Sequence, residues 1–247
     1  MKRCVISLCV LMLAVAIAPA VAQDEEDGMP YVYATYMECD ATRLDEIDEL
    51  MKKMAPVYDA AKEAGEILSW SWGRHHTGGK WRRFFFGSGS DAATLMESLD
   101  ALSEKTQEIE GAEAFGEICG VHEDYLWRQV ASSDVSAVDN PGSYGVSQYY
   151  RCGFNDEAFS DEIVKGHFAK IFNAHVGEGK LTSWSWLSHS IGGEYRRLLA
   201  FRAGSLSDML NTWGEIVEAL DSKESGALRK FSEICFAHQD YVWMTGS

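Results

Sequence analysis

The feature that most constrains this chain is a repeat inside it. Residues 69–83 and residues 183–197 align without a gap at a spacing of 114. Nine residues of the first segment recur in the second: Ser69, Trp70, Ser71, Trp72, His75, Gly78, Gly79, Arg82 and Arg83. Because tryptophan and histidine are rare residues, this match indicates a duplication, and we expect two similar halves.

The first 22 residues have the organisation of a secretory signal peptide. Lys2 and Arg3 precede the apolar run from Val5 to Ile17, and small residues ending at Ala22 form a cleavage site. The apolar run is shorter than the roughly 20 residues that span a membrane. We therefore expect a periplasmic or secreted protein, with 225 of the 247 residues left after cleavage.

The mature chain is expected to be strongly acidic. Cleavage removes two basic residues and no acidic ones, so 20 basic residues remain against 38 acidic residues, a formal charge of −18. Such a charge repels nucleic-acid phosphates and anionic membrane surfaces. We expect neither nucleic acid nor membrane as a partner, and the sequence leaves the oligomeric state open.

Four cysteines remain after cleavage, and four cysteines can pair in three ways. Each half has one early and one late cysteine, so pairing Cys39 with Cys119 and Cys152 with Cys235 treats the halves alike. Export favours oxidation to disulfides.

Zinc binding is the alternative use of these cysteines. Two sulfurs and two imidazole nitrogens in each half would suit a zinc ion. The candidate ligands are Cys39, Cys119, His122 and His75 in the first half, and Cys152, Cys235, His238 and His189 in the second.

Local patterns predict the same order of elements in both halves. In the first half they are a strand over 31–39, a helix from Asp40 or Thr42 to Gly65, strands over 67–72 and 80–86, a helix from Asp91, a short helix over 115–122 and a strand over 125–127. In the second half they are a strand over 144–152, a helix over 156–174, strands over 181–186 and 194–202, a helix over 207–220, a short helix over 231–238 and a strand over 241–244. The polar stretch 131–143 is the expected linker between repeats at 31–130 and 144–247.

Three finer expectations concern the first half. Thr42 and Asp45 have the spacing of a capping box, and Pro56 should kink or split the helix that follows. In the strand over 80–86, Trp81 and Phe85 should share one face, with Phe84 and Phe86 on the other. Both faces would then be apolar, so this strand is expected to be central and covered on both sides.

The order strand, helix, strand, strand, helix, strand in each half is that of ferredoxin-like folds. Together with the W-x-W, glycine-turn and short-helix pattern of both halves, it resembles the dimeric α/β-barrel superfamily. The resemblance implies an α+β fold in which two tandem βαββαβ repeats form one intramolecular barrel. It also implies that the first and last strands of each half are neighbours, which places Cys39 near Cys119. Members include cofactor-free monooxygenases, haem-degrading enzymes and haem-binding chlorite dismutases.

Two sets of repeated residues could contact a ligand. Trp70, Trp72, Trp184 and Trp186 would either line a cavity or pack between sheet and helices, and the sequence does not separate these readings. Adjacent strand residues point to opposite faces, so one arginine of each pair must be covered and needs a carboxylate or an anionic ligand. A carboxylate is favoured for these pairs, which are Arg82 with Arg83 and Arg196 with Arg197.

Two His-x-Asp pairs could supply a catalytic base, because a carboxylate can orient an imidazole. They are His122 with Asp124 and His238 with Asp240. The favoured reading is a buried histidine on the stripe of the short helix with a hydrogen-bonded partner, since oxidised cysteines leave no nucleophile.

The sequence therefore predicts an exported small-molecule-binding or structural protein, without a catalytic motif or resident cofactor. Its ligand would be small and apolar or aromatic. The candidate contacts are Trp70, Trp72, His75, Arg82, Arg83, Trp184, Trp186, His189, Arg196 and Arg197. The alternative is a cofactor-free or haem-dependent enzyme of the monooxygenase type acting in the barrel, with haem or zinc as the candidate cofactor. A third possibility is a partner-binding module with a wide apolar surface.

Overall fold

A computed structural model describes residues 28–133, 142–221 and 226–245. The expected signal peptide and positions 134–141 of the expected linker lie outside the described residues. Within the described part of the chain, no helix is both long and apolar enough to cross a membrane.

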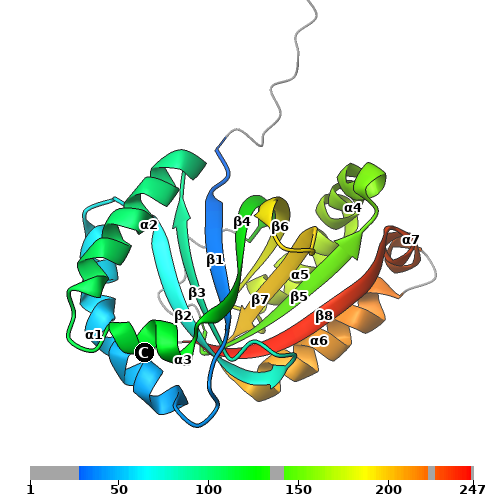
Figure 1. The fold of residues 1–247 in the computed structure, drawn as a ribbon. Coiled ribbons are helices and arrows are strands. Elements are labelled where there is room, and N and C mark those ends of the chain that lie inside the picture. The colour runs from blue at the N-terminus through cyan, green and yellow to red at the C-terminus, as the bar shows by residue number, and fades with distance from the viewer. Residues whose placement is uncertain (1–27, 134–141, 222–225, 246–247) are drawn as a thin grey trace, which may run out of the picture.

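The described residues form a closed antiparallel barrel of eight strands with helices on its outside (Figure 1). Its elements in chain order are β1 (Tyr31–Glu38), α1 (Leu44–Glu63), β2 (Ser69–Gly78), β3 (Arg83–Gly89), α2 (Ala92–Gln107), α3 (Glu113–Ile118), β4 (Val121–Ser132), β5 (Tyr144–Cys152), η1 (Phe154–Asp156), α4 (Glu157–Ile163), η2 (Val164–Phe168), α5 (Ala169–Gly177), β6 (Ser183–Gly192), β7 (Arg197–Ala203), α6 (Leu206–Leu220), α7 (Ala227–Ile234) and β8 (Cys235–Thr245). Around the barrel the strands follow the order β1-β3-β2-β8-β5-β7-β6-β4, and β4 closes the ring on β1. The fold is therefore α+β, as the sequence predicts.

Each half of the chain supplies four neighbouring strands and the helices that cover them. Helices α1, α2 and α3 lie outside β1 to β4, and α4 to α7 lie outside β5 to β8 (Figure 1). The two sets of strands meet where β2 pairs with β8 and where β4 pairs with β6. Apolar side chains alternate along the strands, so one set packs under the helices and the other fills the barrel.

Both predicted disulfides are present in the structure. Cys39 is bonded to Cys119 and Cys152 is bonded to Cys235, across 80 and 83 residues of chain. The sulfur atoms are therefore not available as thiolates, and the zinc interpretation of these cysteines is wrong.

Several predicted boundaries differ from the structure. Strand β3 begins at Arg83, so Trp81 precedes it and does not share a face with Phe85. The Trp81 ring turns into the barrel and stacks on Tyr36 with ring centroids 4.6 Å apart. Trp81 can point into the barrel because it lies in the glycine-rich turn before β3. Side chains in a turn do not have to alternate between the two faces of the sheet as they do in a strand.

The short helices end earlier than predicted and the last strands begin earlier. Helix α3 ends at Ile118, and β4 starts at Val121 and runs to Ser132. His122 and His238 therefore lie on β4 and β8, with half-exposed side chains, and not on a buried helical stripe. The apolar residues before each histidine have helical spacing because the chain passes here from the short helix into the last strand, and the pattern continues across the boundary.

Helix α1 is one uninterrupted element with Pro56 inside it. Its buried side chains Met51, Met54 and Ala61 lie on both sides of the proline, so packing against the sheet holds both parts. The predicted capping box does not form: Asp40 accepts a hydrogen bond from the Thr42 amide at 2.9 Å, which closes a local turn, and the helix begins two residues later at Leu44.

The corresponding helix of the second half contains one extra residue. Asp48 and Asp161, which contact equivalent arginines, are 113 residues apart, whereas Asp59 and Asn173, which contact equivalent tryptophans, are 114 apart. The π-helical segment η2 lies between these positions and accommodates the insertion.

Candidate functional site: the barrel cavity

The repeated tryptophans face the helices. Trp70 and Trp72 donate from Nε1 to Asp59 at 2.9 Å and to Asp48 at 3.1 Å, both on α1. Trp184 and Trp186 do the same to Asn173 and Asp161, each at 2.7 Å. None of the four lines the barrel interior, although Trp72 borders a smaller cavity under α1.

The repeated arginines bind carboxylates of the chain. Arg83 donates from Nε and an Nη atom to the two oxygens of Asp48 at 2.7 and 2.8 Å. Arg197 makes the same paired contact with Asp161, at 2.8 Å to each oxygen. Both arginines are about 4% exposed, so these are buried, paired charges on the helix side of the sheet.

The other arginine of each pair contacts the repeated histidine. Arg82 lies 3.3 Å from His75 Nδ1, and Arg196 lies 2.8 Å from His189 Nδ1. Burial and the charge of Arg82 lower the pKa of His75. Neither histidine lines the barrel cavity.

The histidines and glycine pairs lie where the two sets of strands meet. The ring of His75 packs edge-on against Trp243 of β8, and that of His189 against Trp127 of β4. A Cβ atom at Gly192 would lie 2.1 Å from the carbonyl oxygen of Asp124, and its φ of +119° favours glycine. The glycines therefore let each turn approach the last strand of the other half.

The His-x-Asp pairs are surface contacts. Nδ1 of His122 lies 3.0 Å from Asp124, and Nδ1 of His238 lies 2.8 Å from Asp240. Neither pair borders the barrel cavity. Among the described residues, no group of three or more His, Cys, Asp or Glu side chains is arranged to hold a metal ion.

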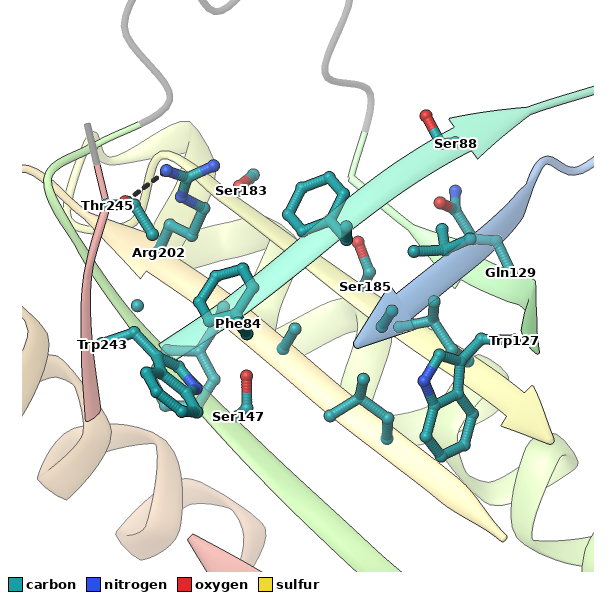
Figure 2. A pocket seen from close by; sticks show the side chains of 18 of the residues that line it. Phe84, Ser88, Trp127, Gln129, Ser147, Ser183, Ser185, Arg202, Trp243 and Thr245 are labelled. Carbon is teal, nitrogen blue, oxygen red and sulfur yellow. Dashed lines mark hydrogen bonds between the residues drawn. The ribbon is translucent and has the colours of Figure 1, made fainter. Parts of the chain in front are cut away.

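A cavity of about 520 Å³ lies inside the barrel (Figure 2). This volume falls within the roughly 300–1,000 Å³ typical of small-molecule sites. Its apolar walls include Val32, Ala34, Phe84, Phe86, Trp127, Leu187, Leu198, Ala200 and Trp243. Its polar side chains include Ser69, Ser88, Gln129, Ser147, Ser183, Ser185, Arg202 and Thr245. Three of the four serines of the repeated S-W-S-W segments, Ser69, Ser183 and Ser185, thus line the interior while the tryptophans face the helices.

Aromatic rings close one end of the cavity. Trp81 stacks between Tyr36 and Tyr241, with centroid distances of 4.6 and 4.8 Å. Tyr149 meets Tyr36 edge-on at 5.1 Å, and both tyrosines line the cavity. We call this end the floor, and the opposite end, where exposed Leu68 lies, the mouth. The barrel is therefore filled at one end and hollow at the other.

Among the described residues that line the cavity, Arg202 is the one with a positive charge, and it lies near the mouth (Figure 2). It donates to the Gly142 carbonyl at 3.1 Å and to the Thr245 hydroxyl, both neutral acceptors. Its Nε atom is shielded from solvent and has no partner among the described residues. Burial lowers the pKa of Arg202 to about 10, so it stays protonated at neutral pH. A half-buried guanidinium with neutral acceptors is suited to an anionic ligand.

Arg202 is not among the ligand contacts that the sequence predicts. At the repeat spacing of 114, Arg202 aligns with Ser88, so a charge in the second half stands where the first half has a hydroxyl. Both residues lie in strands, two positions beyond an inward-facing neighbour: Phe86 in β3 and Ala200 in β7. Two features of the sequence could have indicated Arg202 as a ligand contact: the difference between Arg202 and Ser88 at equivalent positions, and the inward-facing place of both residues in their strands.

The first half contains a second, smaller cavity of about 270 Å³ between its strands and helices. Methionines 37, 51, 54 and 96 are among its lining residues. In the second half the layer between strands and helices contains buried rings that include Phe168, Phe172 and Trp184.

The comparisons with known proteins identify the fold. No protein-family model matches the chain, and no curated protein sequence is significantly similar to it. Solved structures do match. A candidate monooxygenase from Fusobacterium nucleatum subsp. nucleatum ATCC 25586 matches with a TM-score of 0.64 and 8% identity, over 88% of this chain and 93% of that one.

Two further structures have other described activities. A candidate chlorite dismutase matches with a TM-score of 0.54 and 10% identity, over 89% of this chain and 95% of that one. A haem-binding protein from Thermus thermophilus matches with a TM-score of 0.50 and 11% identity, over 89% of this chain and 92% of that one. At these identities the likeness concerns the fold, and the chain has the fold of the dimeric α/β-barrel proteins.

The described residues do not fit haem in the barrel cavity. Haem iron is held by histidine, cysteine, methionine or tyrosine. Of these types only Tyr36 and Tyr149 line the cavity, and both belong to the packed aromatic floor. The two propionates of haem would meet one cation, Arg202. The smaller cavity offers methionine sulfurs but is below the usual size of a small-molecule site, roughly 300 Å³ or more.

Proposed function

We propose that this protein is an enzyme of the monooxygenase type that acts on a small aromatic anion in the barrel cavity, without a resident cofactor. The observation that carries the proposal is Arg202: a half-buried guanidinium whose described hydrogen-bond acceptors are neutral, at a cavity with aromatic walls. The fold of monooxygenase-like proteins supports catalysis over the binding or structural role favoured by the sequence.

The absence of a recognisable catalytic motif in the sequence is consistent with this chemistry. An acidic quinol- or anthrone-type substrate, once ionised, is itself the electron donor to dioxygen. For a CH₂ centre the balance is R₂CH₂ + O₂ → R₂C=O + H₂O, so the electrons come from the substrate carbon and no external reductant is needed. Arg202 would stabilise the substrate anion, and Phe84 and Phe86 would exclude water from it.

Oxygen consumption with quinol- and anthrone-type substrates tests this function. We expect uptake by the metal-free protein, and a rise in KM of roughly tenfold to a hundredfold for Arg202→Met, because a charged hydrogen bond is lost. Arg74→Met, which removes an exposed arginine from β2, is the matched control. Uptake that is absent, or unaffected by Arg202→Met, contradicts the proposal.

A haem-dependent enzyme is the alternative to the cofactor-free proposal, since a haem-binding protein shares the fold, although the residues that line the cavity do not fit haem. Protein purified from cells supplied with haem, or titrated with haemin, tests it by absorption. A Soret band at one haem per chain, abolished by Tyr149→Phe, would replace the cofactor-free proposal with a haem-dependent one.

We also infer that the two halves arose by tandem duplication and that the protein acts after export. The repeated segments and the shared order of elements support the duplication. Two disulfides support an oxidising compartment, either the periplasm or the exterior.

A further inference from the structure

The inner part of the cavity carries buried donors that have no acceptor. Trp127 Nε1, Trp243 Nε1 and Tyr149 Oη are shielded from solvent and make no well-formed hydrogen bond among the described residues. The Tyr36 hydroxyl lies near Trp127 and Tyr149, and Ser147 near Tyr149, without completing such a bond. All three residues line the cavity, and each is 1% exposed or less. Buried polar groups are nearly always hydrogen-bonded in native proteins, so three orphans around one cavity point to a ligand that pairs with them.

The two indole N–H groups point into the same part of the cavity. Figure 2 shows the nitrogens of Trp127 and Trp243 turned toward each other from opposite walls. Tyr149 lies below them in the floor, where burial raises its pKa and that of Tyr36 and keeps both as neutral hydroxyls. An indole N–H only donates, so the matching ligand atom is an acceptor oxygen.

The mouth and the inner part of the cavity recognise different groups. Gln129 and Thr245 follow the two tryptophans by two residues on β4 and β8, which is one step toward the mouth of roughly 7 Å along a strand. Thr245 contacts Arg202, so the charge lies in this outer layer. An anion at Arg202 and an acceptor between the indoles would thus stand apart by about one fused ring system.

The sequence repeat explains why the ligand has one orientation. Trp127 and Trp243 occupy equivalent repeat positions, as do Tyr36 and Tyr149, so the inner donors come as pairs. The mouth is unequal, with Arg202 opposite the repeat-equivalent Ser88. Only one end of the ligand can therefore be anionic.

We propose that Trp127, Trp243 and Tyr149 form an acceptor-recognition site, and that the ligand is an aromatic acid with a carbonyl or hydroxyl oxygen at the end away from its acidic group. This inference rests on the proposed function, in that the acidic group is placed at Arg202. The inference adds a second polar group to the ligand, an acceptor oxygen, and gives its position. The charge of Arg202 alone specifies neither.

Two matched probes test the inference by isothermal titration calorimetry: a naphthalene carboxylic acid, and the same acid with a hydroxyl group on the far ring. We expect the hydroxy acid to bind roughly threefold to tenfold more tightly, the effect of one or two neutral hydrogen bonds. Tyr149→Phe should reduce that preference while leaving the affinity for the plain acid within about twofold, and Trp243→Phe should weaken binding of the hydroxy acid more than binding of the plain acid. Tyr149→Phe removes only the hydroxyl group and keeps the ring, so it remains informative if Trp243→Phe fails to fold.

Control variants outside the cavity are Trp213→Phe on α6 and Tyr31→Phe on β1, which should leave the preference unchanged. Equal binding of the two acids, or an equal loss for both in Tyr149→Phe, overturns the acceptor site and leaves the proposed function standing. If neither acid binds saturably, the proposed function fails and the acceptor site fails with it.

Discussion

In each half one aspartate binds both a repeated arginine and a repeated tryptophan, and in the second half Glu157 also binds Arg197. Asp48 accepts from Arg83 and from the indole of Trp72, and Asp161 does the same for Arg197 and Trp186. Each aspartate thus neutralises a buried charge and also orients a tryptophan between strand and helix. The second tryptophan of each W-x-W pattern and the second arginine of each Arg-Arg pair are explained by this shared partner, which lies on a helix outside the repeated segment.

Removing one of these carboxylates should be costly. Asp48→Ala leaves Arg83 buried without its charge partner, and we expect the free energy of unfolding to fall by about 3–5 kcal/mol. Asp45→Ala, on the first turn of the same helix, is the control and should change it by less than about 0.5 kcal/mol. Urea unfolding measures both.

A double variant separates lost pairing from lost packing. Asp48→Leu combined with Arg83→Met replaces the buried pair by apolar side chains, which is often close to neutral. We expect it to recover most of the stability lost in Asp48→Ala, less about 1 kcal/mol for the hydrogen bond of Trp72. A double variant as unstable as the single one would show that the charge pair is not the cause.

At the scale of elements, the glycine-rich turns join the two halves of the barrel. The turn after β6 touches β4, with Gly192 against the carbonyl of Asp124, and the turn after β2 touches β8, with Gly78 against that of Asp240. Tyr125 and Tyr241 lie beside these contacts and accept backbone N–H groups from the turns. The turns are therefore part of the interface between the halves.

Gly192→Ala should destabilise the protein by about 1–3 kcal/mol, because its backbone has a positive φ and the added methyl group overlaps the Asp124 carbonyl. Gly166→Ala is the matched control, since a Cβ there meets nothing within 4 Å. It lies in the helical segment η2 and should be neutral or stabilising by about 0.4–1 kcal/mol. Thermal unfolding measures both variants. A melting temperature that is lower for Gly166→Ala than for Gly192→Ala would contradict the argument.

At the scale of the whole molecule, each disulfide ties the first strand of a half to the start of its last strand. Each closes a loop of about eighty residues, 80 in one half and 83 in the other, and is expected to contribute roughly 2–4 kcal/mol. Because the two bonds lie in separate halves and share no contacts, their contributions should add.

Paired substitutions test this expectation without a reductant. Cys39→Ser with Cys119→Ser, and Cys152→Ser with Cys235→Ser, should each lower the urea midpoint, and all four together should lower it by about the sum. A fourfold variant as stable as the native protein would contradict a structural role for both bonds. Oxygen uptake should survive in any variant that stays folded, since no cysteine lines the barrel cavity.

The sequence determined the α+β fold, the order of elements and the disulfide pairing, because these depend on patterns along the chain and on comparison of its two halves. Boundaries were less predictable at Trp81 and His122, where one type of element passes into another. The site was not predictable in the same way. The repeated tryptophans and arginines, the most conspicuous candidates, face the helices, and the inward residues between them are serines.

Only the closed barrel decided which of these faces encloses a cavity. Side-chain alternation places Ser69 and Trp70 on opposite faces but does not say which face is hollow, since both are covered. That depends on how rings from eight strands fill the barrel: Trp81 and the tyrosines close one end, and smaller side chains such as Ala200 leave the other open. Arg202 indicates an anion site only in this context. An arginine suggests a ligand when the structure shows that it lines a cavity and that no described carboxylate binds it.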